Sequence, residues 1–157
     1  IGGCNTGEAV ITKGYNLPNK YIIHTVGPRY STGENGEAER LTSAYYKSLK
    51  LAKKKGIRKI AFPSISTGIY RFPVDEGAEI ALNTAIKFLD ENPNSFDLIL
   101  WVLDEKTYIV YKEKYKNNVC YKFFEFSSVF NNICGDLFLT FRKIKLENIP
   151  TLQAEFE

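Results

Sequence analysis

The strongest constraint on the fold is an alternation of two hydrophobic periods along residues 21–115. Short apolar runs at 21–26, 59–62 and 96–103 have the length and residue types of β-strands. Between them, residues 38–55 and the segment that begins at Pro73 repeat apolar side chains at helical spacing. Because strands that alternate with helices are joined by right-handed crossovers, the sequence predicts an α/β fold with a mostly parallel sheet covered by helices.

The helix ends carry signals of their own. The first helix gathers lysines in its last turn, and Gly56 stands where a C-terminal cap belongs. Asp75 and Glu76 lie in the first turn after Pro73, where acidic side chains favour the positive end of the helix dipole. Asp104 is the expected N-cap of a third, shorter helix that runs through Tyr115.

Two further segments are less regular. Residues 9–12 form a β-branched run that ends in a turn, and the continuous apolar character of residues 21–26 predicts burial on both faces. After Tyr115 the chain is rich in phenylalanine, and residues 119–126 and 137–146 are candidate strands. We therefore divide the chain into residues 1–115 and an unassigned extension, residues 116–157.

Composition narrows the class of protein. A chain of 157 residues with 44% hydrophobic and 25% charged side chains is typical of one globular domain, and it contains no apolar stretch long enough to cross a bilayer. Three scattered cysteines argue against a disulfide framework and a zinc knuckle and favour a reducing, cytoplasmic location. A net charge of +3 is too small to indicate a nucleic-acid partner.

The loop that follows the strand at 59–62 is the candidate ligand site. In open α/β sheets, ligands bind beyond the carboxyl ends of the strands. Gly68 allows close approach of the backbone, successive amides can surround an anion, and the hydroxyl groups of Ser64, Ser66 and Thr67 add donors. Tyr70 offers an aromatic face to a sugar or base. The alternative is an ordinary strand-to-helix connection, since the loop matches neither a P-loop nor a dinucleotide fingerprint.

Two long blocks resemble the macrodomain family. Residues 3–28, from Gly-Cys-Asn-Thr-Gly-Glu-Ala to His-Thr-Val-Gly-Pro, and residues 60–73, Ile-Ala-Phe-Pro-Ser-Ile-Ser-Thr-Gly-Ile-Tyr-Arg-Phe-Pro, are similar to the branch that includes hydrolases of O-acetyl-ADP-ribose and of mono-ADP-ribosylated proteins. The resemblance covers Gly2 to about Tyr115. It implies a three-layer α/β/α fold with ADP-ribose in a cleft, no cofactor, and a diphosphate held by the loop amides, with Tyr70 near the distal ribose. The expected ligand-binding residues are Ser64, Ser66, Thr67, Gly68, Ile69 and Tyr70.

Two family motifs do not occur in this sequence. They are an Asn-Ala-Ala-Asn motif and a glycine-rich loop whose aspartate serves catalysis. The chain also begins at Ile1 and contains no methionine. We therefore expect an N-terminally truncated domain whose central sheet lacks its first strands, and we assign no catalytic residue. Such a chain is predicted to bind ADP-ribose weakly and not to hydrolyse it, unless strands of the phenylalanine-rich extension cover the open edge.

Other candidate residues have simpler explanations. His24 is interpreted as a hydrogen-bonded structural histidine in a buried strand, and a zinc site with Cys4 is not expected. Asp75 and Glu76 are explained by the helix dipole, Trp101 by the core, and Arg71 by exposure to solvent. Three functions remain as hypotheses: a hydrolase, a reader that only binds ADP-ribose or ADP-ribosylated protein, and a nucleic-acid-binding module, which the balanced charge disfavours.

Overall fold

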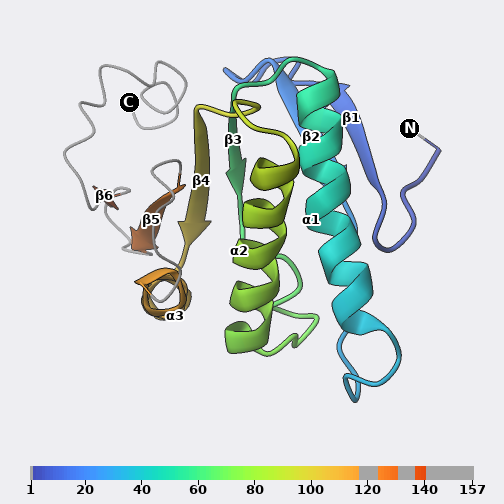
Figure 1. The fold of residues 1–157 in the computed structure, drawn as a ribbon, viewed down its shortest axis with the longest axis vertical. Coiled ribbons are helices and arrows are strands. Elements are labelled where there is room, and N and C mark those ends of the chain that lie inside the picture. The colour runs from blue at the N-terminus through green and yellow to red at the C-terminus, as the bar shows by residue number, and fades with distance from the viewer. Residues whose placement is uncertain (1, 117–123, 131–136, 141–157) are drawn as a thin grey trace.

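The computed structural model of the chain describes residues 2–116, 124–130 and 137–140. Its elements, in chain order, are β1 (Ala9–Lys13), β2 (Tyr21–Thr25), α1 (Glu37–Lys54), β3 (Lys59–Phe62), α2 (Val74–Glu91), β4 (Leu98–Leu103), α3 (Glu105–Lys116), β5 (Phe124–Phe130) and β6 (Leu137–Thr140). Figure 1 shows α1 and α2 side by side in front of β3 and β4.

The main sheet has the strand order β3-β4-β5-β6. β3 and β4 are parallel, with Phe62 opposite Trp101, and β5 adds to the other edge of β4, again parallel. Only β6, which pairs with β5, is antiparallel. The α/β class and the mostly parallel sheet predicted from the alternation are therefore confirmed.

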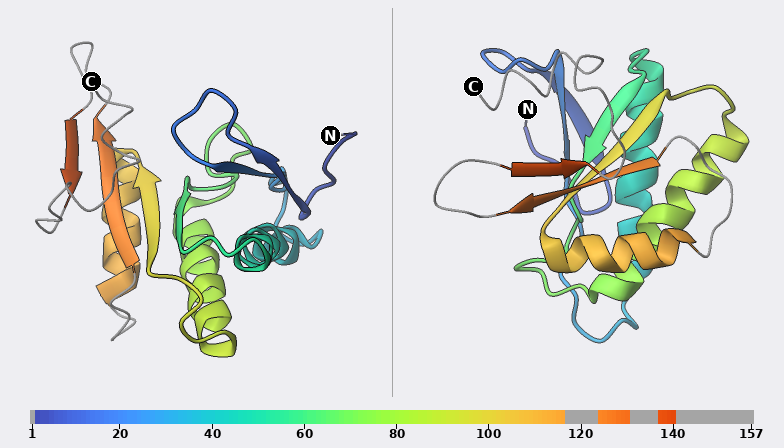
Figure 2. Two further views of the ribbon diagram at one scale, coloured as in Figure 1. Left: turned by 90° about the horizontal axis from the view of Figure 1, so that it is seen from above. Right: turned by 90° about the vertical axis from the view of Figure 1, so that its left-hand side faces the viewer.

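The first two strands form a separate antiparallel hairpin, in which Ile11 pairs with Ile23. Figure 2 shows this hairpin apart from β3, on the side away from β5. The prediction that residues 21–26 are buried on both faces was wrong, because the side chains of β2 are half-buried and His24 is exposed. A continuously apolar strand usually lies inside a sheet that is covered on both faces. Within the described residues β2 has one neighbouring strand, and its apolar side chains are not covered on both sides.

The helices contact one face of the main sheet through a cluster of aromatic side chains. Trp101 is fully buried, stacks on Phe62 and contacts Tyr45 of α1 and Tyr111 of α3. Small residues, Ala78, Ala81 and Ala85 among them, let α2 pack closely against its neighbours. Of a three-layer arrangement, the described residues thus contain the sheet and one helical layer. The assignment of Trp101 to the core is confirmed.

The predicted caps are also confirmed. Gly56 has φ 69°, its amide donates to the Lys53 carbonyl, and the next amide, of Ile57, donates to the Ala52 carbonyl, which is the hydrogen-bond pattern of a glycine-capped helix end. At α3, the Asp104 carboxylate accepts the amide of Thr107 at 3.0 Å. In the extension, β5 overlaps the candidate strand 119–126 at residues 124–126, and β6 lies within the candidate strand 137–146. Residues 119–123 and 141–146 of these candidates fall outside the described residues.

Among the described residues, the helices are too short or too polar to cross a membrane.

Candidate functional site at the end of β3

The loop between β3 and α2 is held in a strained shape by its own hydrogen bonds. Ser66 and Arg71 both have left-handed backbones, with φ 68° and 58°, which non-glycine residues rarely adopt. The Phe72 amide donates to the Ser66 carbonyl at 3.0 Å, and the Arg71 amide donates to the Gly68 carbonyl at 2.9 Å. The Thr67 hydroxyl donates to the Ser64 carbonyl at 3.2 Å. These bonds turn the chain back on itself directly after Pro63.

This shape leaves a run of five consecutive backbone amides, residues 66–70, without a hydrogen-bond acceptor in the described part of the chain. The amide before the run, of Ile65, and the two after it, of Arg71 and Phe72, are all paired. Ile69 extends into solvent with 92% of its side chain exposed. Adjacent unpaired amides in a turn form a concave donor surface of the kind that binds anions, and the N-terminus of α2 follows a few residues later.

Two glycines allow the loop to lie close to its neighbours. A Cβ atom on Gly27, just after β2, would stand 2.1 Å from Ser66 Oγ and 2.5 Å from Ile65 Cγ2. A Cβ atom on Gly77, in the first turns of α2, would stand 2.9 Å from Thr67 Cγ2. The end of β2 and the start of α2 therefore hold the loop between them, and neither position has room for a side chain.

The segment that follows β2 also contacts the loop, and sequence reasoning did not identify it. The Tyr30 amide donates to the Tyr70 carbonyl at 2.9 Å, and the Arg29 guanidinium lies 5.3 Å from the centre of the Tyr70 ring. The Tyr30 ring meets Phe72 edge-on at 5.0 Å. An arginine and a tyrosine directly after a strand that ends in Gly-Pro were the available signal, because such a segment begins at the carboxyl end of a strand, as the loop does.

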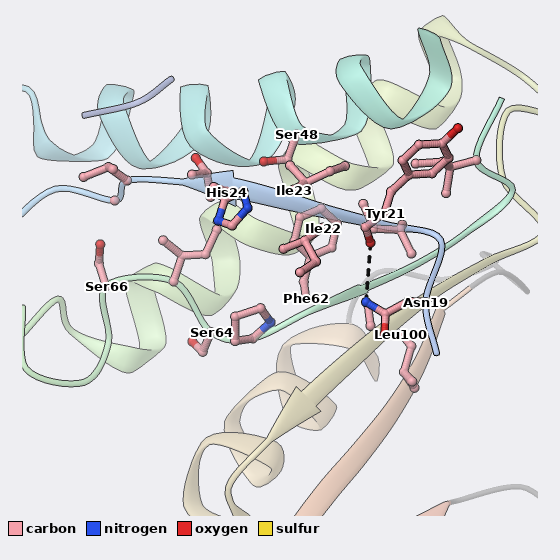
Figure 3. A pocket seen from close by; sticks show the side chains of 18 of the residues that line it. Asn19, Tyr21, Ile22, Ile23, His24, Ser48, Phe62, Ser64, Ser66 and Leu100 are labelled. Carbon is pink, nitrogen blue, oxygen red and sulfur yellow. Dashed lines mark hydrogen bonds between the residues drawn. The ribbon is translucent and has the colours of Figure 1, made fainter. Parts of the chain in front are cut away.

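A cavity of about 850 Å³ connects the loop to the space between β2 and β3. Its walls come from β2, from β3 and the loop, and from Leu98 and Leu100 of β4, and Ser48 of α1 also lines it (Figure 3). His24 borders the cavity, and its Nε2 lies 2.9 Å from Thr12 Oγ1. The expected hydrogen bond of His24 is confirmed, but its burial is not, since its strand is open on the cavity side.

Comparison with known proteins places this fold and loop in a family. The Macro domain family model matches residues 1–81, which is more than half of the chain. The chain belongs to the macro domain family. Uncharacterized protein FN1951 of Fusobacterium nucleatum is 91% identical over 116 residues, which are 74% of this chain and 66% of that protein. Human ADP-ribose glycohydrolase MACROD2 is 49% identical over 116 residues, which are 73% of this chain and 27% of that protein.

Solved macro domains share the fold. The Oceanobacillus iheyensis macrodomain with ADP is 44% identical with a TM-score of 0.68, covering 73% of this chain and 60% of that one. The Trypanosoma brucei macrodomain in complex with ADP-ribose is 38% identical with a TM-score of 0.65, covering 71% and 46%. This macro domain spans 66% or less of the length of the curated relatives that it matches.

The structure of the macro domain brings the predicted ligand-binding residues together in one loop but gives their side chains different surroundings. Ser64 Oγ lies 3.1 Å from Tyr111 Oη, on the helical side of the sheet. Ser66 Oγ is buried with no hydrogen-bond partner in the described chain. Gly68 and Ile69 are exposed, and Tyr70 is half-buried beneath Arg29. What these residues have in common is therefore their backbone rather than their side chains.

Other candidate residues lie away from the amides. Asp75 is exposed, and its Oδ1 lies 3.8 Å from Lys114 Nζ, while Glu76 is exposed beside it. Arg71 is exposed, as predicted. Cys4 Sγ lies 3.8 Å from the carbonyl oxygen of His24, and the described residues contain no cluster of three histidine, cysteine or acidic side chains that would hold a metal.

Proposed function

We propose that this macro domain binds ADP-ribose, either free or attached to a protein, and that the amides of residues 66–70 hold its diphosphate. The observation that carries the proposal is the run of five unpaired amides at the carboxyl end of β3. A diphosphate presents several anionic oxygens within a few ångströms, and adjacent unpaired N–H groups are donors of the kind that bind such oxygens. Related macro domains have been solved with ADP and with ADP-ribose, which supports the same ligand class here.

Tyr70 is proposed to pack against the distal ribose. Its ring is half-buried, its carbonyl is held by the Tyr30 amide, and Arg29 lies over one face of the ring. The ring is therefore fixed next to the amides, where a sugar attached to the diphosphate would lie. Ser64, Ser66 and Thr67 shape the loop in this proposal, and their hydroxyl groups are secondary to the backbone.

The binding experiment is a calorimetric titration of the chain with ADP-ribose and, separately, with adenosine. We expect ADP-ribose to bind with a dissociation constant of about 100 µM, or roughly −5.5 kcal/mol, and adenosine to bind more weakly because it cannot reach the amides. Affinity is expected to be modest because the cavity is open along β2 and β3. Equal affinities for the two compounds would contradict the proposal, and low-micromolar binding would contradict the expected weakness.

A second candidate function is hydrolysis of the ADP-ribosyl bond or of O-acetyl-ADP-ribose, which the similarity to a glycohydrolase favours. We propose that this chain alone acts as a reader, because its sequence contains neither the Asn-Ala-Ala-Asn motif nor the glycine-rich loop with aspartate. The test compares release of ADP-ribose from a mono-ADP-ribosylated protein by this chain and by the longer Fusobacterium nucleatum protein, which is 91% identical over the shared residues. Turnover by this chain would overturn the assignment as a reader.

A further inference from the structure

The unpaired amides depend on a loop conformation that its own residues do not favour. Left-handed backbones at Ser66 and Arg71 persist only where surrounding structure fixes them. The bonds inside the loop, from Arg71 to Gly68 and from Phe72 to Ser66, fix its far end. At the near end, residues 63–65, no backbone amide donates to another residue of the loop. A residue outside the loop must therefore hold this end.

Tyr45 of α1 holds the near end. Its side chain is 1% exposed, and its ring lies edge-on against Phe62 and Trp101, with ring centres 5.6 Å away in both pairs. From this fixed position the Tyr45 hydroxyl accepts the Ile65 amide at 2.9 Å and lies 3.5 Å from the Pro63 carbonyl. Ile65 is the residue immediately before the unpaired run, so this bond determines where the run begins.

Tyr111 of α3 extends the same support. It is fully buried, its ring packs against Trp101, and its hydroxyl lies 3.1 Å from Ser64 Oγ. The Tyr111 hydroxyl therefore lies at Ser64 and the Tyr45 hydroxyl at Ile65, the next residue of the loop. Side chains from two helices far apart in the sequence thus support the start of the loop. Both tyrosines are buried, and neither is among the residues that line the cavity.

We propose that Tyr45 and Tyr111 are positioning residues, which hold residues 64 and 65 so that the five following amides stay open to a diphosphate. The identity of the ligand rests on the proposed function. The effect of the two hydroxyl groups on the loop of the ligand-free protein is independent of that function. If the Tyr45 hydroxyl is removed, the Ile65 amide loses its acceptor in a partly buried position, and the loop must rearrange to find another. The rearrangement would disturb the bonds at Arg71 and Phe72 that close the turn.

The test uses Tyr45→Phe, Tyr111→Phe and the double variant, with Tyr46→Phe as the matched control. Tyr46 neighbours Tyr45 on α1, but its hydroxyl bonds Glu91 at 2.9 Å and does not reach the loop. Amide hydrogen exchange in the ligand-free protein is measured at Ile65, Arg71 and Phe72, whose bonds report the loop shape. We expect exchange at these amides to rise about tenfold or more in Tyr45→Phe, and not in Tyr46→Phe.

The ligand arm measures affinity by NMR titration, which reaches weak binding. Tyr45→Phe is expected to weaken ADP-ribose binding about tenfold and to leave adenosine binding within twofold, because only the diphosphate contacts the amides. A purely structural role would weaken both compounds equally and would overturn the proposal, as would unchanged exchange at Arg71 and Phe72. Should Tyr45→Phe unfold, amide exchange and the two affinities are measured on Tyr111→Phe instead, and the same outcomes support or overturn the proposal. If the wild-type chain does not bind ADP-ribose, the proposed function fails while the exchange measurement still tests the positioning role.

Discussion

At the scale of single residues, Glu37 shows how one buried carboxylate fixes the entry to α1. Its side chain is 1% exposed and accepts the Ser31 hydroxyl at 2.7 Å, the Ser31 amide at 3.2 Å and the Asn35 amide at 2.7 Å. The bond from the Ser31 hydroxyl, together with the backbone donors, lowers the pKa of Glu37 to about 2. The loop before α1, which leads from Arg29 and Tyr30, is therefore tied to an ionised side chain.

The stability of the fold should depend on this ionisation. Because the pKa of Glu37 is lower in the folded chain than in the unfolded one, its stabilisation is complete above about pH 4.5 and is lost as pH falls toward 2. Thermal melts of the wild type and of Glu37→Gln, recorded from pH 7 to pH 2, test this. We expect the variant to melt lower at pH 7 and to lose less on acidification. Glu39→Gln, an exposed change on the same helix, is the control, and parallel pH profiles for wild type and Glu37→Gln would contradict the argument.

At the scale of elements, the end of β2 contacts the loop after β3. A glycine at this contact has no room for a side chain, whereas a glycine elsewhere in the loop does. A methyl group on Gly27 would overlap Ser66 Oγ at 2.1 Å, whereas a Cβ atom on Gly68 would meet nothing within 4 Å. Gly27→Ala is therefore expected to lower the free energy of unfolding by about 1–3 kcal/mol and to weaken ADP-ribose binding as the loop shifts.

Gly68→Val should keep the stability of the wild type but obstruct the ligand, since residue 68 lines the cavity. Chemical denaturation and titration of both variants check this, and a stable, fully binding Gly27→Ala would refute it.

The same elements show what sequence could and could not predict. Helix limits followed from apolar periodicity and capping residues such as Gly56 and Asp104, because these signals are local. The loop was identified because a strand led directly into Ser-Thr-Gly. Its left-handed residues, Ser66 and Arg71, were not predictable, because hydrogen bonds that form only in the folded loop hold that conformation against local preference. The supporting tyrosines were missed for the same reason, since helical spacing marks Tyr45 and Tyr111 only as core residues.

At the scale of the whole molecule, β2 and β3 border one cavity, and each has one partner strand within the described residues. There β2 pairs with β1 and β3 with β4, and side chains of both strands line the space between them. Edge strands present unpaired backbone donors and acceptors, which are templates for pairing with another chain. The half-buried apolar side chain of Ile22, on β2, increases that tendency.

We therefore expect the purified chain to associate as its concentration rises, through the cavity side of the sheet. Ala61 is exposed on β3 and lines the cavity, so Ala61→Lys places a charge at that edge and should suppress association. Thr42→Lys adds the same charge at an exposed position on α1 outside this cavity and should leave association unchanged. Sedimentation velocity over a concentration series distinguishes the variants. A wild-type chain that stays monomeric, or equal effects of the two lysines, would mean that these edges are not templates for pairing.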